Sequence, residues 1–216
     1  MNLLRIKTLI ISLLGNYLFA QEKVHVASET LTQIHDTTFV DIASLDVSFS
    51  FDLKYATADN FLQAVIYDCP KCYLRYKVAK ALMAAQAEFM QLGYRIRLLD
   101  CYRPLSAQKL MFEKVPNPRY VASPVTGSVH NRGAAVDITL ETLEGELLDM
   151  GTDFDHFGPQ SAWEYQGFSE NIKNNRNLLR NLMGKHGFDT IQSEWWHFNF
   201  RQTQKDPISD FKWSCD

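Results

Sequence analysis

The sequence predicts an α+β fold, a single domain with an antiparallel sheet and flanking helices. Three observations support this prediction. A long amphipathic helical pattern comes early, segments typical of strands and hairpins dominate later, and helices and strands do not alternate regularly as they do around a parallel sheet. The 216 residues, 46% of them hydrophobic, are enough for one domain with a real core.

The longest predicted helix in the first half covers residues 75–92. Its apolar side chains recur at spacings of three and four, for example at Val78, Leu82 and Phe89. Gly93 follows directly and is the kind of residue that ends a helix. The pattern predicts a helix with one buried face.

A strand and a shorter helix follow. Residues 94–100, "YRIRLLD", alternate apolar with basic side chains and predict a strand. Residues 103–115 predict a short helix, because Pro104 suits a first helical turn. Residues 134–140, "AAVDITL", predict the next strand.

The second half adds a hairpin, a helix and a strand. Residues 142–150 predict a hairpin around Glu144-Gly145. Residues 170–186 predict a helix with Ser169 as its N-cap and a glycine past its end. Residues 193–200, "SEWWHFNF", are aromatic-rich and alternating, and predict a core strand.

The N-terminus has the layout of a secretory signal peptide. Arg5 and Lys7 precede an apolar run, residues 9–14, that is shorter than the ~20 residues of a spanning helix. We therefore expect residues 1–20 to be removed after Ala20, which places the mature chain in the periplasm or outside the cell. The alternative is an N-terminal membrane anchor.

The mature chain is expected to have two parts, a polar, loosely attached N-terminal arm at residues 21–45 and a single folded domain at residues 46–216. The net charge is small, 22 − 25 = −3 for the full chain. It indicates neither nucleic acid nor, after signal cleavage, a membrane as partner. The oligomeric state stays open.

The four cysteines are Cys69, Cys72, Cys101 and Cys215. An even number in an exported chain favours structural disulfides. The "CPKC" at 69–72 could also be a redox pair or half of a zinc knuckle, but the chain holds no second C-x-x-C. The sequence leaves all three full pairings open.

The stretch "GSVHNRGAAVD" at 127–137 holds a candidate metal-binding pair, His130 and Asp137. Asp137 stands between Val136 and Ile138, so we expect its carboxylate to face inward or line a cleft, where it needs a partner. The alternative is a carboxylate that faces solvent on a half-exposed strand.

A second stretch, "EWWHF" at 194–198, holds Glu194 and His197. On a regular strand these two side chains point to opposite faces, so they meet only if the strand twists, bulges or ends between them. Two histidines and the carboxylate of Asp137 match the three protein ligands of a catalytic zinc site. Glu194 then suits the general base, and His156 is an alternative ligand.

A candidate cation comes from "DCYRP" at 100–104. Arg103 follows a predicted strand and precedes a proline that fixes the backbone. Its guanidinium could stabilise the oxyanion of a tetrahedral intermediate. The alternative is an ordinary Asp100–Arg103 surface pair.

From about residue 46 to residue 200, the chain resembles the D-alanyl-D-alanine dipeptidases of the vancomycin-resistance type. These belong to a larger group of zinc peptidases that includes D,D-carboxypeptidases. Five motifs in order carry the resemblance: "DLKYATADNF" (52–61), "LLDCYRP" (98–104), "GSVHNRGAAVDITL" (127–140), "MGTDFD" (150–155) and "EWWHF" (194–198). The resemblance implies the zinc D,D-peptidase fold.

It also implies a catalytic site. One Zn²⁺ per chain is held by His130, Asp137 and His197, Glu194 acts as the base, and Arg103 stabilises the oxyanion. The implied substrate is the small dipeptide D-Ala-D-Ala, hydrolysed to two D-alanines.

The resemblance further implies substrate contacts at Tyr55 and Asp155 for the free amino end and at Ser128 for the carboxylate end. These contacts favour a dipeptidase, because a D,D-carboxypeptidase acting on longer wall peptides leaves the amino end open. A carboxypeptidase is the first alternative, and a binding protein without catalysis is the second. The export signal, the extra cysteines and a short gap between Arg103 and His130 depart from the resistance enzymes.

Overall fold

The computed structural model describes residues 34–118, 120–203 and 206–215. The chain divides into two units, residues 1–38 and 39–216, and the fold below is that of the second. The predicted signal peptide, residues 1–20, lies outside the described residues and stays a prediction.

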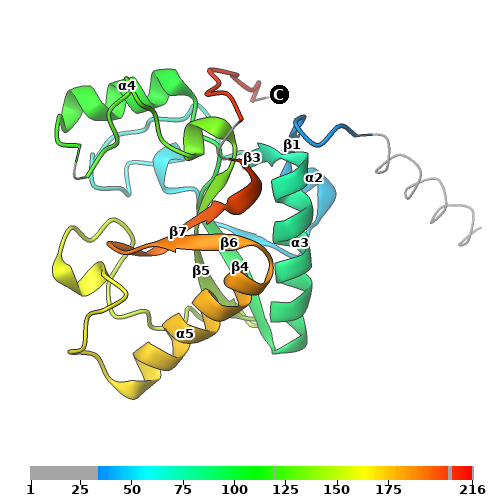
Figure 1. The fold of residues 1–216 in the computed structure, drawn as a ribbon, viewed down its shortest axis with the longest axis vertical. Coiled ribbons are helices and arrows are strands. Elements are labelled where there is room, and N and C mark those ends of the chain that lie inside the picture. The colour runs from blue at the N-terminus through cyan, green and yellow to red at the C-terminus, as the bar shows by residue number, and fades with distance from the viewer. Residues whose placement is uncertain (1–33, 119, 204–205, 216) are drawn as a thin grey trace, which may run out of the picture. The chain divides into compact units, whose positions relative to one another are not determined.

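The described part of the chain contains a five-stranded sheet with the strand order β2-β4-β5-β7-β6 (Figure 1). β4, β5, β7 and β6 pair antiparallel, while β2 runs parallel to β4. The α+β prediction is therefore confirmed, with one parallel edge pair that the sequence does not reveal. The strands are β2 (Ser50–Phe51), β4 (Tyr94–Asp100), β5 (Ala135–Thr142), β7 (Glu194–Phe200) and β6 (Phe188–Ile191).

The three predicted helices form close to their expected bounds, as α3 (Tyr76–Gln91), α4 (Leu105–Lys114) and α5 (Glu170–Lys185). Gly93 has a φ of +85° after α3, and Ser169 caps α5 by accepting a bond from the Ile172 amide. Figure 1 shows α3 and α5 beside the sheet and α4 apart from both.

The core lies between the sheet and the apolar faces of α3 and α5. Fully buried side chains from five elements meet there, namely Phe89, Leu98, Ile138, Leu179 and Phe198. The β4–β5–β7 centre of the sheet therefore rests on a packed layer. That layer fixes the strands from which the candidate site projects.

The compact unit begins at Phe39, earlier than the expected boundary at residue 46. β1 (Phe39–Asp41) pairs with β3 (Tyr73–Arg75) in a small second sheet, and α2 (Ile42–Leu45) follows β1. Ile42 is fully buried. Residues 39–45 thus belong to the domain rather than to a loose arm, because the pairing of β1 and the burial of Ile42 anchor this short segment.

Two further segments differ from the sequence prediction. The expected hairpin at 142–150 is a tight turn with one isolated Glu141–Leu147 bridge, and Gly145 has a φ of +94°. β6 has no sequence prediction, because it is a four-residue edge strand directly after Gly187. No helix among the described residues is both long enough and apolar enough to span a membrane.

The cysteines form two disulfides, Cys69–Cys215 and Cys72–Cys101, with Cα–Cα distances of 5.8 and 5.3 Å. The two cysteines of "CPKC" therefore bond to distant partners and form neither a redox pair nor a zinc knuckle. Cys72–Cys101 joins the segment before β3 to the end of β4, two residues before Arg103.

Replacing both Cys72 and Cys101 with serine is expected to lower the free energy of unfolding by about 3 kcal/mol, because the bridge restrains the unfolded chain. Denaturant unfolding at fixed pH measures the change. Cys69→Ser with Cys215→Ser is the comparison variant, since its bridge spans a sequence separation of 146 rather than 29 and should contribute more on the same account. An unchanged unfolding midpoint for the first pair contradicts the prediction.

Candidate active site

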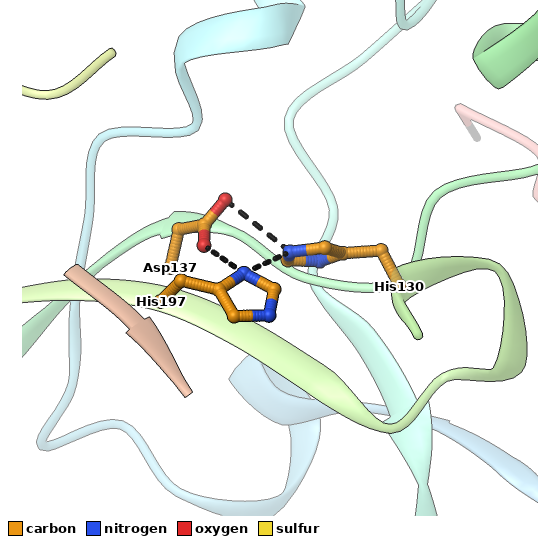
Figure 2. Close-up of side chains that lie close together, drawn as sticks. All are labelled: His130, Asp137 and His197. Carbon is orange, nitrogen blue, oxygen red and sulfur yellow. Dashed lines mark hydrogen bonds and ion pairs between the residues drawn. The ribbon is translucent and has the colours of Figure 1, made fainter. Parts of the chain in front are cut away.

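Three buried side chains meet beside the paired strands β5 and β7: His130, Asp137 and His197 (Figure 2). His197 Nδ1 lies 3.0 Å from Asp137 Oδ1 and 3.1 Å from His130 Nε2. His130 Nε2 lies 3.3 Å from Asp137 Oδ2. The structure thus brings together all three predicted metal ligands, which lie up to 67 residues apart in sequence.

Sheet register places two of these side chains. Asp137 on β5 and His197 on β7 are direct partners in the antiparallel ladder, so their side chains project from the same face. His130 opens the short 3₁₀ turn η2 (His130–Arg132), and Gly133 with a φ of +67° turns the chain into β5. A side chain at Gly133 would collide with the ring of Phe39. The glycine therefore permits the tight turn between the two ligands.

The outer atoms of both imidazoles orient them for a metal ion. His130 Nδ1 donates to the Cys101 carbonyl at 2.7 Å, and His197 Nε2 donates to Asn199 Oδ1 at 2.9 Å. With these nitrogens acting as donors, the neutral rings direct their lone pairs toward each other and toward the carboxylate of Asp137. Three acceptors in contact need a cation between them.

The distances also suit zinc. Ligands at about 2.0–2.1 Å from a tetrahedral zinc ion lie about 3.3 Å apart, and the three separations here are 3.0, 3.1 and 3.3 Å. The donor set therefore fits a zinc ion.

Glu194 joins the group because β7 is bulged. Thr190 pairs with Phe198, yet Ile191 pairs with Glu194, so the intervening residues of β7 bulge out of register. The irregularity brings Glu194 Oε2 to 4.0 Å from His197 Nδ1. The condition that the sequence sets for these two residues to meet is satisfied. Burial raises the pKa of Glu194; His197 lowers it and Asp137 raises it further.

Arg103 is buried rather than part of a surface pair. Its Nη2 and Nε donate to Asp100 Oδ2 at 2.7 and 3.2 Å, and its Nη1 donates to Gln108 Oε1 at 3.0 Å. Tyr67 donates to the other oxygen of Asp100 at 2.8 Å. Burial disfavours the charge on Arg103, but Asp100 holds its pKa well above the ordinary value.

The backbone of Arg103 is hydrogen-bonded to η2, the short turn that carries His130. Its amide donates to the His130 carbonyl at 3.1 Å, and Asn131 donates to the Arg103 carbonyl at 2.8 Å. The Arg103 guanidinium also lies over the ring of Tyr55, 5.1 Å from its centroid. The predicted cation therefore stands beside the predicted metal ligands.

Tyr55 and Asp155, expected at the amino end of the substrate, contact each other. Tyr55 donates to Asp155 Oδ2 at 2.9 Å. Asp155 holds a left-handed backbone conformation with a φ of +57°, which is unusual for a residue other than glycine and is common at functional sites. Burial raises the pKa of Asp155 well above its ordinary range, and Asp137 raises it further. A cation bound there would favour its charged form.

Two candidates remain, Ser128 as a substrate contact and His156 as an alternative metal ligand. Ser128 Oγ accepts a bond from the His130 amide at 3.3 Å. The contact of Ser128 with the substrate carboxylate stays a prediction. His156 is exposed, lies 3.4 Å from Gln160 Oε1, and is not part of the His–Asp–His group. The structure therefore does not place His156, the alternative ligand, with the three clustered residues.

The sequence reasoning missed three supporting residues, Asn199, Gln108 and Tyr67. Asn199 had a usable signal, because it stands two positions after His197 and so shares its side of an alternating strand. Gln108 and Tyr67 reach the Asp100–Arg103 pair only through tertiary packing.

A pocket of about 380 Å³ opens beside Glu194 and is also lined by Trp196, Phe157 and Tyr120.

One protein-family model matches nearly all of the described chain. The family model described as "D-ala-D-ala dipeptidase" matches residues 35–214. The match defines the class of the protein, a peptidase. The chain belongs to the D-alanyl-D-alanine dipeptidase family.

Two relatives have the same description. The D-alanyl-D-alanine dipeptidase of Escherichia coli is 37% identical over 182 residues, which cover 83% of this chain and 94% of the relative. The D-alanyl-D-alanine dipeptidase of Enterococcus faecium is 33% identical over 175 residues, covering 70% of this chain and 85% of the relative.

Two solved structures align with part of the chain, each with a TM-score of 0.41. One is the vancomycin-resistance D,D-pentapeptidase VanY in complex with Zn(II), 15% identical, covering 60% of this chain and 73% of that one. The other is the LdcB LD-carboxypeptidase, 20% identical, covering 59% of both chains.

Proposed function

We propose that this peptidase is a zinc-dependent D-Ala-D-Ala dipeptidase, with His130, Asp137 and His197 as the zinc ligands. The observation that carries the proposal is the convergence of three lone-pair atoms at 3.0–3.3 Å, with Glu194 Oε2 4.0 Å from one of them. When bound, zinc supplies Lewis-acid chemistry at the scissile carbonyl.

Glu194 acts as the general base and then as the general acid. It takes a proton from the attacking water and delivers it to the amine of the leaving D-alanine. Burial raises the pKa of Glu194, which favours its return of the proton to the leaving amine.

Arg103 binds the oxyanion that develops as the water attacks. Asp100 and Gln108 hold its guanidinium in place before the reaction, so little reorganisation is needed when charge appears. Preorganised donors of this kind lower barriers by a few kcal/mol, about 10²–10³ in rate.

Asp155 pairs the free ammonium of the dipeptide, Tyr55 orients that carboxylate, and Ser128 binds the carboxylate end. A site with an anionic partner for the ammonium at one end and a hydroxyl donor for the carboxylate at the other favours a free dipeptide over a longer peptide. A D,D-carboxypeptidase is the alternative, because the zinc ligands and Glu194 serve either reaction equally well.

We also propose that the enzyme acts in the periplasm or outside the cell, after cleavage of residues 1–20. Two disulfides support an oxidising compartment. The dipeptide released from wall peptides is then its substrate, and the balanced charge supports neither nucleic acid nor a membrane as partner.

The test is a substrate panel on the chain from residue 21 onward: free D-Ala-D-Ala, its N-acetyl derivative and a longer peptide ending in D-Ala-D-Ala. We expect D-alanine release from the free dipeptide only, abolished by a chelator and restored by zinc. Faster cleavage of the blocked or longer substrate supports the carboxypeptidase, and inertness with zinc bound overturns both enzymes.

Asp155→Asn is expected to raise KM for D-Ala-D-Ala about tenfold or more while kcat changes less, because the substitution removes an ion pair present in both ground and transition states. It should also narrow the preference for the free dipeptide over its N-acetyl form. Steady-state kinetics measures both effects. Asp153→Asn, at an exposed position two residues away, is the matched control. An unchanged KM contradicts the ammonium role.

A further inference from the structure

The segment that carries Asp155 has few secondary-structure bonds of its own. Residues 150–162, the Asp155 loop, connect the turn after β5 to the segment before α5 and contain only the short turn η3 (Pro159–Ser161) (Figure 1). Asp155 itself stands in a left-handed conformation. Other parts of the domain must therefore hold the loop in place.

One buried side chain from α5 binds both ends of this loop. Arg176, 4% exposed, donates through Nε to the Met150 carbonyl at 2.7 Å. Its Nη2 donates to the Gln160 carbonyl at 3.0 Å and its Nη1 to the Ala162 carbonyl at 3.1 Å. The planar guanidinium thus fixes three carbonyls that lie on either side of Asp155.

The surroundings of Arg176 suit this role better than an ion pair. Its guanidinium carbon lies 4.6 Å from the centroid of Phe168 and 5.7 Å from that of Trp195. Burial lowers its pKa to about 10, although Asp149 raises it, so the group stays charged at neutral pH. A charged group is costly to bury, and here its cost is offset by bonds to loop carbonyls and by aromatic faces.

A further contact connects the Asp155 loop to β7, the strand that carries Glu194. Trp195, the neighbour of Glu194 on β7, donates through its indole to Thr152 Oγ1 at 2.8 Å. Gly151 has a φ of +82°, and a side chain there would come within 2.7 Å of the Phe168 ring. The loop end, Trp195, Phe168 and Arg176 therefore form one packed unit.

We propose that Arg176 is a positioning residue that sets Asp155 at a fixed place relative to Glu194 and so determines the affinity for the free amino end of the substrate. The inference rests on the proposed ammonium role of Asp155. Arg176 is too deeply buried and too fully bound to the loop to contact the substrate itself.

The test uses Arg176→Met, which keeps the unbranched stem of the side chain but removes all three donors. We expect KM for D-Ala-D-Ala to rise about tenfold, kcat to change by about threefold or less, and the zinc content to stay the same. Arg180→Met is the matched control, because Arg180 is exposed on the same helix and its guanidinium lies over Trp163. All variants are assayed well below their unfolding midpoints.

A double-mutant cycle separates positioning from stability. In the Asp155→Asn background, Arg176→Met should raise KM by a further factor of about two at most, because no ammonium partner remains to be positioned. Arg176→Lys, which keeps the charge but not the three-way fork, should raise KM less than Arg176→Met and in the same direction. It replaces Arg176→Met in the cycle if the latter does not fold.

The possible outcomes are distinct. A wild-type KM in both Arg176 variants, with only the unfolding midpoint lowered, overturns the positioning role. An equal rise of KM in the wild-type and Asp155→Asn backgrounds also overturns it while leaving the proposed function intact. If Asp155→Asn itself leaves KM unchanged, the ammonium role fails and the positioning role fails with it.

Discussion

Glu194→Gln is expected to keep zinc bound and to lower kcat for D-Ala-D-Ala by a factor of about 10³. Glutamine has the same shape as glutamate but cannot accept a proton from water. Glu194 stands 4.0 Å from His197 Nδ1 and is not one of the three residues that could hold the metal. Metal analysis and kcat at saturating dipeptide together measure the two effects.

Glu164→Gln provides the matched control, because Glu164 is exposed. It should have wild-type kcat and zinc content. A loss of zinc in Glu194→Gln would make Glu194 a ligand rather than the base, and a loss of kcat of less than about tenfold would place the base elsewhere.

The pH dependence gives a second measure of the same residue. A general base works when deprotonated, so kcat/KM rises with pH as Glu194 loses its proton. Because burial raises the pKa of Glu194, this acidic limb should lie above the ordinary range of a glutamate. The residual activity of Glu194→Gln should lack the limb.

The regular elements of this fold could be predicted because their patterns are local. The apolar spacing in residues 75–92 determines α3. Ser169 caps the start of α5, and Gly187 follows its C-cap. The parallel pairing of β2 with β4 could not be predicted in the same way, because a two-residue strand has no pattern of its own.

The geometry of the candidate site could not be predicted from local sequence patterns. The motif around His130 and Asp137 suggests a metal site, but its geometry depends on the register of β5 against β7, which are distant in sequence. The Asp100–Arg103 pair is a case in point. Read locally it could lie on the surface, and only the packing of Tyr67 and Gln108 around it makes it a buried, fixed cation.

Arg176 carried a signal that the sequence reasoning did not use. Positions 176, 179 and 183 fall on one face of α5, and all three side chains are buried. An arginine at the spacing of an apolar stripe needs buried acceptors, and here these are the carbonyls of the Asp155 loop. Which carbonyls they are depends on a loop of irregular structure, which periodicity does not describe.

His197→Ala is expected to abolish zinc binding at micromolar metal and, with it, turnover. Removing Nδ1 leaves two protein ligands, and the buried carboxylate of Asp137 loses one of its two imidazole partners. Zinc that binds only the folded state also stabilises it, by about 2.7 kcal/mol at a hundredfold excess over Kd. The unfolding midpoint of the wild type should therefore fall when a chelator is added, while that of His197→Ala should not respond.

His156→Ala is the discriminating control for this prediction. His156 is exposed beside the same pocket and is the other histidine weighed as a ligand. We expect its alanine variant to bind one zinc per chain and to keep a chelator-sensitive unfolding midpoint. Normal zinc binding by His197→Ala, or loss of zinc in His156→Ala, would show that the ligand set is wrong.

Since His197 Nε2 donates to Asn199, Asn199→Leu should weaken zinc binding about 10–100-fold without removing a ligand.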